Sequence, residues 1–128
     1  MKKTYTIKKF DSETEIDFSK VPALNIHNCL WDKTGYAPVS MGQICYTDKG
    51  FFVKLTSYET EITGRYENLN EPVYTDSCLE FFINPTPETN KRYMNFETNC
   101  LGTLLLGIGE KGGERTAVEV DFRKTFNM

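Results

Sequence analysis

The chain has 128 residues, a formal net charge of −3 and a pI near 5.2. This length supports one domain with its own core and is too short for two. The acidic balance provides no basic field for phosphate backbones, so nucleic-acid binding is not expected. No segment approaches the roughly 20 consecutive apolar residues that a membrane-spanning helix needs. We therefore predict a single domain over residues 1–128 with neither nucleic acid nor membrane as partner.

The first ten residues contain four lysines but no apolar run behind them. This pattern is typical of a first strand and not of a signal peptide, whose basic start is followed by an apolar segment. We therefore predict a cytoplasmic protein, or a secreted one if a leader has been removed from the sequence.

The cysteines of the chain, Cys29, Cys45, Cys78 and Cys100, are widely spaced, and His27 is its one histidine. No two cysteines have the C-x-x-C spacing, so a zinc site is not expected. Each cysteine lies in or beside an apolar run, and cysteine is among the residues most often buried. We predict free, buried thiols, with a disulfide as the alternative if the protein is exported.

Short strand-like segments follow one another along the chain, and aromatic residues, which favour strands, make up 13% of it. No window of helical length carries an apolar stripe at helical spacing. Turn signals separate the segments at intervals typical of sandwiches and barrels, as at residues 48–50 and 109–113. We predict an all-β fold, an antiparallel β-sandwich of the jelly-roll or immunoglobulin-like kind. The predicted strands are 4–9, 23–30, 42–47, 51–58, 77–84, 92–99, 103–108 and 116–122, with a long loop over 60–72.

The last predicted strand, in which Val118, Val120 and Phe122 alternate, lies a few residues before the end of the sequence. A sandwich that ends on an edge strand exposes unpaired backbone groups, and such edges recruit partners. We expect either a partner chain that completes the fold, hence a homodimer through this edge, or a further C-terminal segment.

Strict two-residue alternation gives two neighbouring predicted strands an apolar and a polar side. The apolar side of residues 74–84 carries Leu79, Phe81 and Ile83, and the opposite side carries Tyr74, Asp76, Cys78, Glu80 and Phe82. In the next strand Met94, Phe96 and Thr98 are expected in the core, with Tyr93, Asn95, Glu97 and Asn99 opposite. If these strands pair, Glu80 lies near Tyr93, Asn95 or Glu97.

Such a stripe of acid, amide and phenol groups is a candidate sugar site. Carboxylates and amides exchange hydrogen bonds with vicinal hydroxyls, while aromatic rings pack on the C–H face of a pyranose. A solvated outer sheet face shows the same alternation and needs no ligand, so the pattern leaves both readings open. Trp31 lies in an irregular loop over residues 31–38 and is either a core side chain or a further platform for a sugar ring.

Two other chemistries use acids of this region. Glu80 and Glu97 could form the acid/base pair of a glycosidase, which needs two carboxylates across the bond that is cleaved. Asp76, Glu59 and Glu61 could bind a structural calcium ion through their oxygens, although the sequence has no D-x-D-x-D loop. No other cofactor is indicated.

An ordered series of segments resembles the family 9 carbohydrate-binding modules, and most closely the bacterial family-9-like domains. The segments are Tyr-Thr-Asp-Lys-Gly-Phe-Phe-Val at 46–53, Tyr-Glu at 58–59, Val-Tyr-Thr-Asp-Ser-Cys-Leu-Glu-Phe-Phe-Ile at 73–83, Tyr-Met-Asn-Phe-Glu at 93–97 and Gly-Thr at 102–103. The resemblance implies a β-sandwich that binds glucan or xylan chains, often at the reducing end. It also implies attachment to xylanases or other polysaccharide hydrolases, and in several members a structural calcium ion.

The same resemblance assigns roles to particular residues. Glu80 matches the acid of the motif that contacts sugar hydroxyls, and Tyr74 takes the place of one tryptophan of the family's aromatic clamp. Asn95 and Glu97 match the following strand. The second clamp tryptophan belongs to a C-terminal part that the resemblance implies is absent from this sequence.

We therefore predict a non-catalytic domain that binds gluco- or xylo-oligosaccharides, or polysaccharide chain ends, and serves polysaccharide breakdown. Arg92 would have to supply an arginine that the resemblance implies near Tyr93. The alternatives are a β-sandwich interaction or dimerisation module without sugar binding, and a glycoside hydrolase. The predicted sugar-binding residues are Tyr74, Glu80, Tyr93, Asn95, Glu97 and Trp31.

Overall fold

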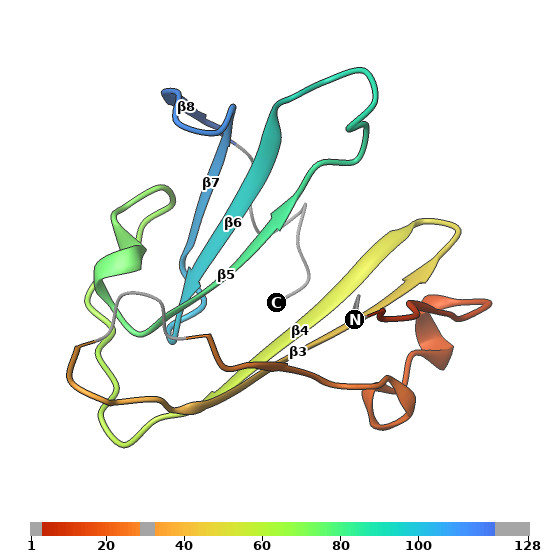
Figure 1. The fold of residues 1–128 in the computed structure, drawn as a ribbon, viewed down its shortest axis with the longest axis horizontal. Helices are drawn as coiled ribbons and strands as arrows, with labels where there is room; N and C mark the ends of the chain where they lie inside the picture. Colours follow the sequence, from red (N-terminus) through yellow and green to blue (C-terminus); the bar gives the residue numbers. More distant parts are fainter. Residues whose placement is uncertain (1–3, 29–32, 120–128) are drawn as a thin grey trace. The chain divides into compact units, whose positions relative to one another are not determined.

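The computed structural model describes residues 4–28 and 33–119 of the chain. Within these ranges the protein is all-β, with eight strands in two four-stranded sheets and three short 3-10 helices (Figure 1). The sheets are mainly antiparallel and neither closes into a barrel, so the predicted all-β sandwich class is confirmed. Each sheet belongs to one of two compact units, residues 1–60 and 61–128. None of the described helices has the length and apolarity to cross a membrane.

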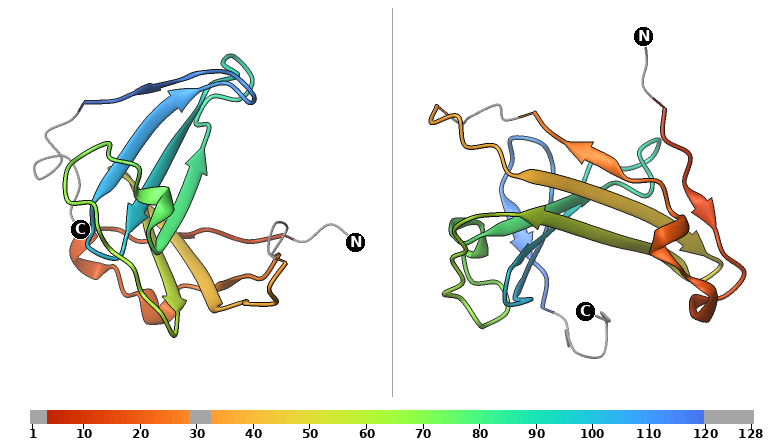
Figure 2. Two further views of the ribbon diagram at one scale, coloured as in Figure 1. Left: turned by 90° about the vertical axis from the view of Figure 1, so that its left-hand side faces the viewer. Right: turned by 90° about the horizontal axis from the view of Figure 1, so that it is seen from below.

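The first unit is built around a long hairpin (Figure 2). Its central strand pairs antiparallel with the strands that precede and follow it, and parallel with the first strand. Gly50 closes the hairpin with a φ of +152°, which a residue with a Cβ rarely adopts. The elements are β1 (Lys8–Lys9), η1 (Glu13–Glu15), η2 (Phe18–Lys20), β2 (Leu24–Ile26), β3 (Val39–Thr47) and β4 (Gly50–Tyr58).

The core of the first unit forms where the 3-10 segment packs on β3. Phe10, Val21 and Cys45 are buried together, with 8%, 4% and 0% of their surfaces exposed. Gln43 on β3 donates through Nε2 to the carbonyl oxygens of Phe18 and Val21, each at 2.7 Å. Phe18 O also accepts from Val21 N at 3.2 Å, so the Gln43 bonds add a second contact there, and they hold the segment on the sheet.

Two predicted strands of the first unit are shorter than expected. In the predicted strand 4–9 only Lys8–Lys9 pairs, and it runs parallel to β3. The residues before it are tied by a side chain instead, because the Tyr5 hydroxyl donates to the carbonyl oxygen of Pro22 at 2.6 Å. Of the predicted strand 23–30, Leu24–Ile26 is observed, and residues 29–30 lie outside the described part of the chain.

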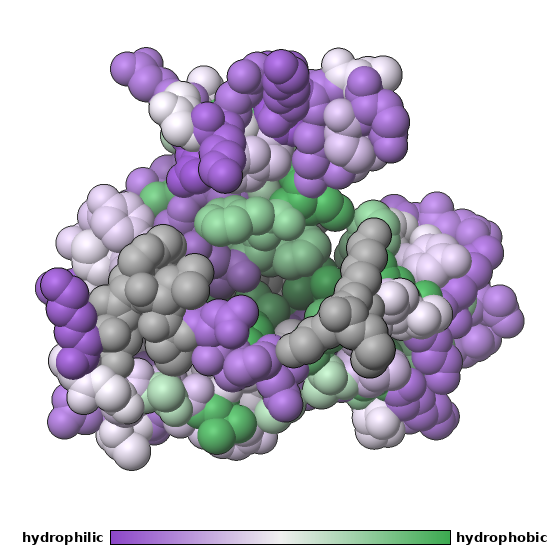
Figure 3. Space-filling model, viewed as in Figure 1, coloured by the Kyte–Doolittle hydropathy of each residue, from purple (hydrophilic) through white to green (hydrophobic). Residues whose placement is uncertain are grey.

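The second unit holds an antiparallel sheet in the order β5-β6-β7-β8. The predicted strands 77–84, 92–99 and 103–108 are confirmed to within two residues at each end. Figure 3 shows hydrophobic residues gathered in the part of the view where β5 and β6 lie. Phe81 and Phe96, opposite one another on these strands, form a tilted ring pair with centroids 6.4 Å apart. The elements are η3 (Val73–Thr75), β5 (Cys78–Ile83), β6 (Tyr93–Asn99), β7 (Leu104–Gly109) and β8 (Arg115–Ala117).

The last strand is observed only in part. β8 pairs with β7 over Arg115–Ala117, whereas the prediction placed the strand at 116–122. Val120 and Phe122 lie outside the described residues. A homodimer, or a partner chain that completes the sheet, therefore stays a prediction.

Asn70 forms hydrogen bonds with backbone groups of β7 in the part of this strand that does not pair with β8. Its backbone N–H donates to Leu104 O at 2.9 Å, and its Oδ1 accepts from Leu106 N, also at 2.9 Å. Its Nδ2 donates to Val118 O at 3.1 Å. The residue has a φ of +64°, in the left-handed region that asparagine tolerates better than most residues. The predicted loop 60–72 is thus anchored to the sheet.

The three described cysteines, Cys45, Cys78 and Cys100, are free, as predicted, and differ in burial. Cys45 is buried and Cys78 is half-buried, but Cys100 is exposed, so the prediction of burial is wrong there. Cys100 follows the end of β6 at a turn, where its Sγ contacts Thr63 O at 3.5 Å. Cys29 lies outside the described residues.

Candidate functional site

One side of the β5–β8 sheet carries most of the polar and charged side chains of its strands. The register places Glu80 opposite Glu97 and Phe82 opposite Asn95, as the alternation predicts. Residues directly opposite each other in antiparallel strands share a side of the sheet. We call this side the polar face; it comprises Cys78, Glu80, Phe82, Tyr93, Asn95, Glu97, Asn99, Leu105, Gly107, Gly109, Arg115 and Ala117.

The centre of the polar face is unexpectedly well buried. Asn95, Glu97 and Asn99 are 1%, 6% and 5% exposed, whereas the alternate residues Met94 and Phe96 of the same strand are half-buried. β6 lies between β5 and β7, so neighbouring side chains cover its polar groups from both directions. A merely solvated sheet face would not bury an amide and a carboxylate in this way.

Glu80 and Glu97 form a pair of like charges on adjacent strands. Burial and the charge of Glu97 raise the pKa of the Glu80 carboxyl, and the Arg115 guanidinium opposes this only in part. Burial and the same two carboxylates raise the pKa of the neighbouring Cys78 thiol to about 12. Like charges directly opposite one another destabilise a sheet, so this pair weakens the fold unless something neutralises it.

Asn95 has one satisfied and one unsatisfied polar atom. Its Nδ2 donates to Glu97 Oε1 at 2.6 Å, but its Oδ1 is buried without a hydrogen-bond partner. The Oδ1 atom lies over Gly107 of β7, where a Cβ would come within 2.7 Å of it. An unpaired buried acceptor costs about 1–3 kcal/mol, and such a group in a native protein is explained by strain, by a functional role or by a bound water or ion.

Two aromatic rings and one guanidinium lie at the end of the polar face. The rings of Phe82 and Tyr93 meet edge to face with centroids 5.8 Å apart. The Arg115 guanidinium lies 5.8 Å from the centroid of Phe82 and 5.1 Å from that of Tyr93, and it donates to the Tyr93 hydroxyl. Gly109 leaves room for the Arg115 side chain, whose Cγ would lie 2.9 Å from a Cβ at this glycine.

The arginine beside Tyr93 is therefore Arg115 and not Arg92, which corrects the expectation from the sequence. The backbone N–H of Arg92 donates to Asn90 Oδ1 at 3.0 Å, and its Nε reaches the same oxygen at 3.4 Å. Arg115 follows the Gly-Gly turn of a hairpin whose register places residue 115 opposite residue 109. The sequence shows the turn but does not fix this register, and the predicted strand began one residue later.

Tyr74 does not belong to the strand that carries Glu80. It lies in η3, and β5 begins only at Cys78, so the prediction that one strand runs through Tyr74 and Asp76 to Glu80 is wrong. A 3-10 turn has three residues per turn and breaks the two-residue period of a strand. Tyr74 is 59% exposed, while its neighbour Val73 is fully buried. Trp31 lies outside the described residues.

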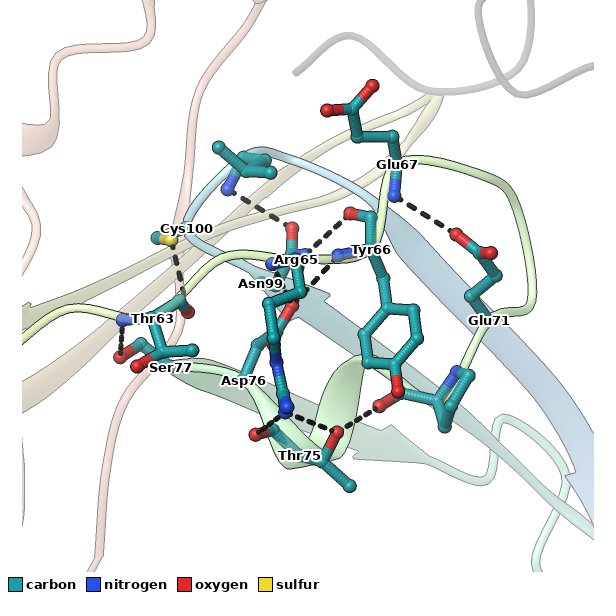
Figure 4. A network of polar contacts seen from close by, with 12 residues as sticks. Thr63, Arg65, Tyr66, Glu67, Glu71, Thr75, Asp76, Ser77, Asn99 and Cys100 are labelled. Carbon is teal, nitrogen blue, oxygen red and sulfur yellow. Dashed lines mark hydrogen bonds and ion pairs between the residues drawn. The ribbon is translucent and has the colours of Figure 1, made fainter.

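Asp76 is the centre of a separate polar network (Figure 4). Its side chain is 0% exposed, and its Oδ2 accepts from the backbone N–H groups of Arg65 and Tyr66 at 2.8 and 3.2 Å. Asn99 Nδ2 donates to the same oxygen at 3.0 Å, and Arg65 Nε donates to Oδ1 at 3.0 Å. Burial disfavours the charged form, but these hydrogen bonds outweigh it and hold the pKa of Asp76 well below its usual range.

This network ties the loop before η3 to β6, which is a structural role. Both oxygens of Asp76 accept hydrogen bonds within the protein. Residues 4–28 and 33–119 contain no group of three or more His, Cys, Asp or Glu side chains that could hold a metal ion. A structural calcium ion at Asp76, Glu59 or Glu61 stays a prediction.

Comparison with known proteins identifies the family. Residues 11–127 match the family model described as carbohydrate-binding family 9. The chain belongs to this family. The resemblance seen in the sequence is thereby confirmed, and the function of the family, carbohydrate binding, agrees with the chemistry of the polar face.

A solved structure resembles this family 9 chain as well. It is the crystal structure of a candidate carbohydrate-binding protein from Bacteroides uniformis, with a TM-score of 0.76 and 24% sequence identity. The match covers 88% of this chain and 55% of that protein, so the chain spans about half the length of its relative. At this identity the likeness shows the fold alone. No curated protein matches the chain significantly.

Proposed function

We propose that this chain is a non-catalytic carbohydrate-binding module that holds the end of a gluco- or xylo-configured chain on its polar face. One observation carries the proposal. In a member of carbohydrate-binding family 9, the acceptors Glu80, Asn95 and Glu97 share one side of a sheet with the rings of Phe82 and Tyr93.

This arrangement suits a sugar because a pyranose presents hydroxyl donors at its rim and C–H groups on its faces. Phe82 is 50% exposed and offers the apolar contact. The carboxylate of Glu80, which is exposed, accepts from hydroxyls, and Arg115 can donate to ring or hydroxyl oxygens. Tyr74, 59% exposed in η3, stays a predicted second aromatic contact.

The family favours binding over catalysis, because its model describes carbohydrate binding. Glu80 and Glu97, directly opposite one another on one side of the sheet, act in this proposal as acceptors for sugar hydroxyls. We further propose that the module serves polysaccharide breakdown as a partner of a hydrolase.

Calorimetric titration with gluco-, xylo- and galacto-oligosaccharides tests the proposal. Each sugar is used with its reducing end intact and chemically reduced, and chromatography of the mixture checks for cleavage. We expect uncleaved gluco- or xylo-oligosaccharides to bind, more tightly with an intact end. Glu80→Gln should weaken binding roughly tenfold, the value of a lost charged hydrogen bond.

Glu67→Gln is the matched control, because Glu67 is an exposed loop acid outside the polar face. This variant should bind as the wild type does. Binding to none of the sugars, or equal binding by the Glu80→Gln variant, would overturn the proposal or its site. Cleavage that is lost with Glu80→Gln would instead establish a glycoside hydrolase.

A further inference from the structure

The polar face holds acceptors that the protein leaves unsatisfied. Burial and the charge of Glu97 raise the pKa of the Glu80 carboxyl, which faces another acid. Glu97 receives one bond from Asn95, whose own Oδ1 receives none. Of the side-chain donors on the face, Asn95 Nδ2 donates to Glu97, Asn99 Nδ2 donates to Tyr66 O and to Asp76, and Arg115 donates to the Tyr93 hydroxyl. A ligand that pairs with Glu80 and with Asn95 Oδ1 must therefore bring donors.

The face also has a surplus of negative charge. Its paired strand residues include two carboxylates, Glu80 and Glu97, and one cation, Arg115, so the sum is −1. A neutral sugar would satisfy hydrogen bonds but leave the two carboxylates facing one another. A ligand with a single positive charge would bring the sum to zero and would relieve this repulsion in a partly desolvated place.

An ammonium group meets both requirements at once. It is compact, it carries one positive charge, and it has three donors and no acceptor. The three acceptor groups of the face lie on two adjacent strands, since Glu80 is opposite Glu97 and Asn95 Nδ2 contacts Glu97 Oε1 at 2.6 Å. Phe82, opposite Asn95, supplies the apolar surface for a ring that bears this group.

We propose that the polar face selects a sugar with an unmodified amino group, a 2-amino-2-deoxy unit of a gluco-configured chain. The ammonium group donates to Asn95 Oδ1 and to the carboxylates of Glu80 and Glu97. The inference rests on the proposed function of this same face and names the class of sugar. Asn95 is 1% exposed, whereas Phe82 and Arg115 beside it are exposed.

The test compares four probes by calorimetry at pH 6.5, where a sugar amine is protonated. They are the glucosamine trimer, the N-acetylglucosamine trimer, the glucose trimer and ethanolamine, an amine without a sugar ring. We expect the glucosamine trimer to bind roughly tenfold more tightly than either neutral trimer, from one added charge contact. Ethanolamine should bind far more weakly, because it has no ring to place on Phe82.

Variants distinguish binding at the polar face from nonspecific attraction of a cationic sugar to an acidic protein. Glu80→Gln should reduce the preference for the glucosamine trimer over the glucose trimer to roughly threefold or less, while the control Glu67→Gln retains it. Glu80 is exposed, so this variant is expected to fold, and circular dichroism verifies that it does. A preference that persists in Glu80→Gln would overturn the inference.

Failure of the inference and failure of the proposed function give different results. Glucose-trimer binding equal to or tighter than glucosamine-trimer binding overturns the amino-sugar inference and leaves the carbohydrate module intact. Binding of ethanolamine as tight as that of the glucosamine trimer also overturns it, because the sugar ring would then contribute nothing. Binding of none of the sugars, in this set and in the wider panel, overturns both.

Discussion

The second unit contains two carboxylate clusters with opposite properties. The Asp76 carboxylate accepts four hydrogen bonds, whereas the Glu80 carboxylate faces another acid. The surroundings lower the pKa of Asp76 and raise the pKa of Glu80. Both clusters belong to one sheet and its loop, so the class of fold does not distinguish them.

The difference lies in whether the protein itself supplies the partners. Around Asp76 the donors come from Arg65, Tyr66 and Asn99, and the charge holds a loop in place. Around Glu80 and Glu97 the acceptors outnumber the donors, and Asn95 Oδ1 is left with none. Polar groups that a fold leaves unsatisfied are the ones available to a ligand.

The largest expected effect comes from breaking the satisfied cluster. Asp76→Asn removes the negative charge and replaces one accepting oxygen by a donor that cannot pair with Arg65. We expect the melting temperature at pH 7 to fall by roughly 5–10 °C, because buried donors lose a charged partner. Thermal unfolding followed by circular dichroism measures this change. A fall of less than 2 °C would mean that the network does not stabilise the unit.

The stability difference between the wild type and Asp76→Asn should depend on pH. The folded-state pKa of Asp76 lies below its unfolded value, so its contribution is complete above about pH 4 and is lost as the pH falls through the folded value. The stability gap between wild type and Asp76→Asn should therefore close on acidification. Urea unfolding at a series of pH values measures the gap, and a gap that widens below pH 4 would contradict the assigned pKa direction.

A smaller effect of opposite sign is expected at the unsatisfied cluster. The pKa of Glu80 is raised in the folded state, so its contribution to stability is present below about pH 4.3 and is lost as the pH rises through the folded value. Glu80→Gln should therefore match the wild type near pH 4. At pH 7 it should melt roughly 1–3 °C higher, a modest gain because solvent screens an exposed carboxylate. A variant less stable than the wild type at pH 7 would show that Glu80 and Glu97 do not repel one another.

The smallest change in stability is expected for Arg115. Arg115→Met keeps an unbranched apolar side chain beside Phe82 and Tyr93 but removes the charged group, and we expect a stability change within roughly 0.5 kcal/mol. Without this cation the pKa of Glu80 should rise further, because Arg115 lowers it in the wild type. Glutamate side-chain NMR titration measures that shift, and Arg115→Lys should restore most of it. An unchanged Glu80 pKa in Arg115→Met would mean that the charge of Arg115 does not act on the Glu80 carboxyl.

Much of the polar face follows from the sequence because it depends on strand parity alone. Glu80, Asn95 and Glu97 fall on one side of β5 and β6 whatever the exact ends of these strands. Tyr74 was misplaced because the 3-10 turn that follows Pro72 interrupts the strand period. Arg115 was missed because its position depends on the register of a later hairpin, which alternation does not fix.

The first unit was less predictable for a related reason. Its core segment over residues 10–21 has no strand or helix period and is held by Gln43, through bonds to backbone carbonyl groups. Contacts of this kind depend on which distant segment reaches a side chain. Composition and periodicity therefore do not predict these contacts.

Asn70 has a consequence for how such a module behaves at high concentration. A strand edge with open N–H and C=O groups is a template on which other chains can grow into ordered aggregates. Asn70 occupies the backbone groups of Leu104 and Leu106 and also reaches Val118. A single asparagine in the left-handed region thus satisfies backbone groups at this edge that another chain would need for such growth.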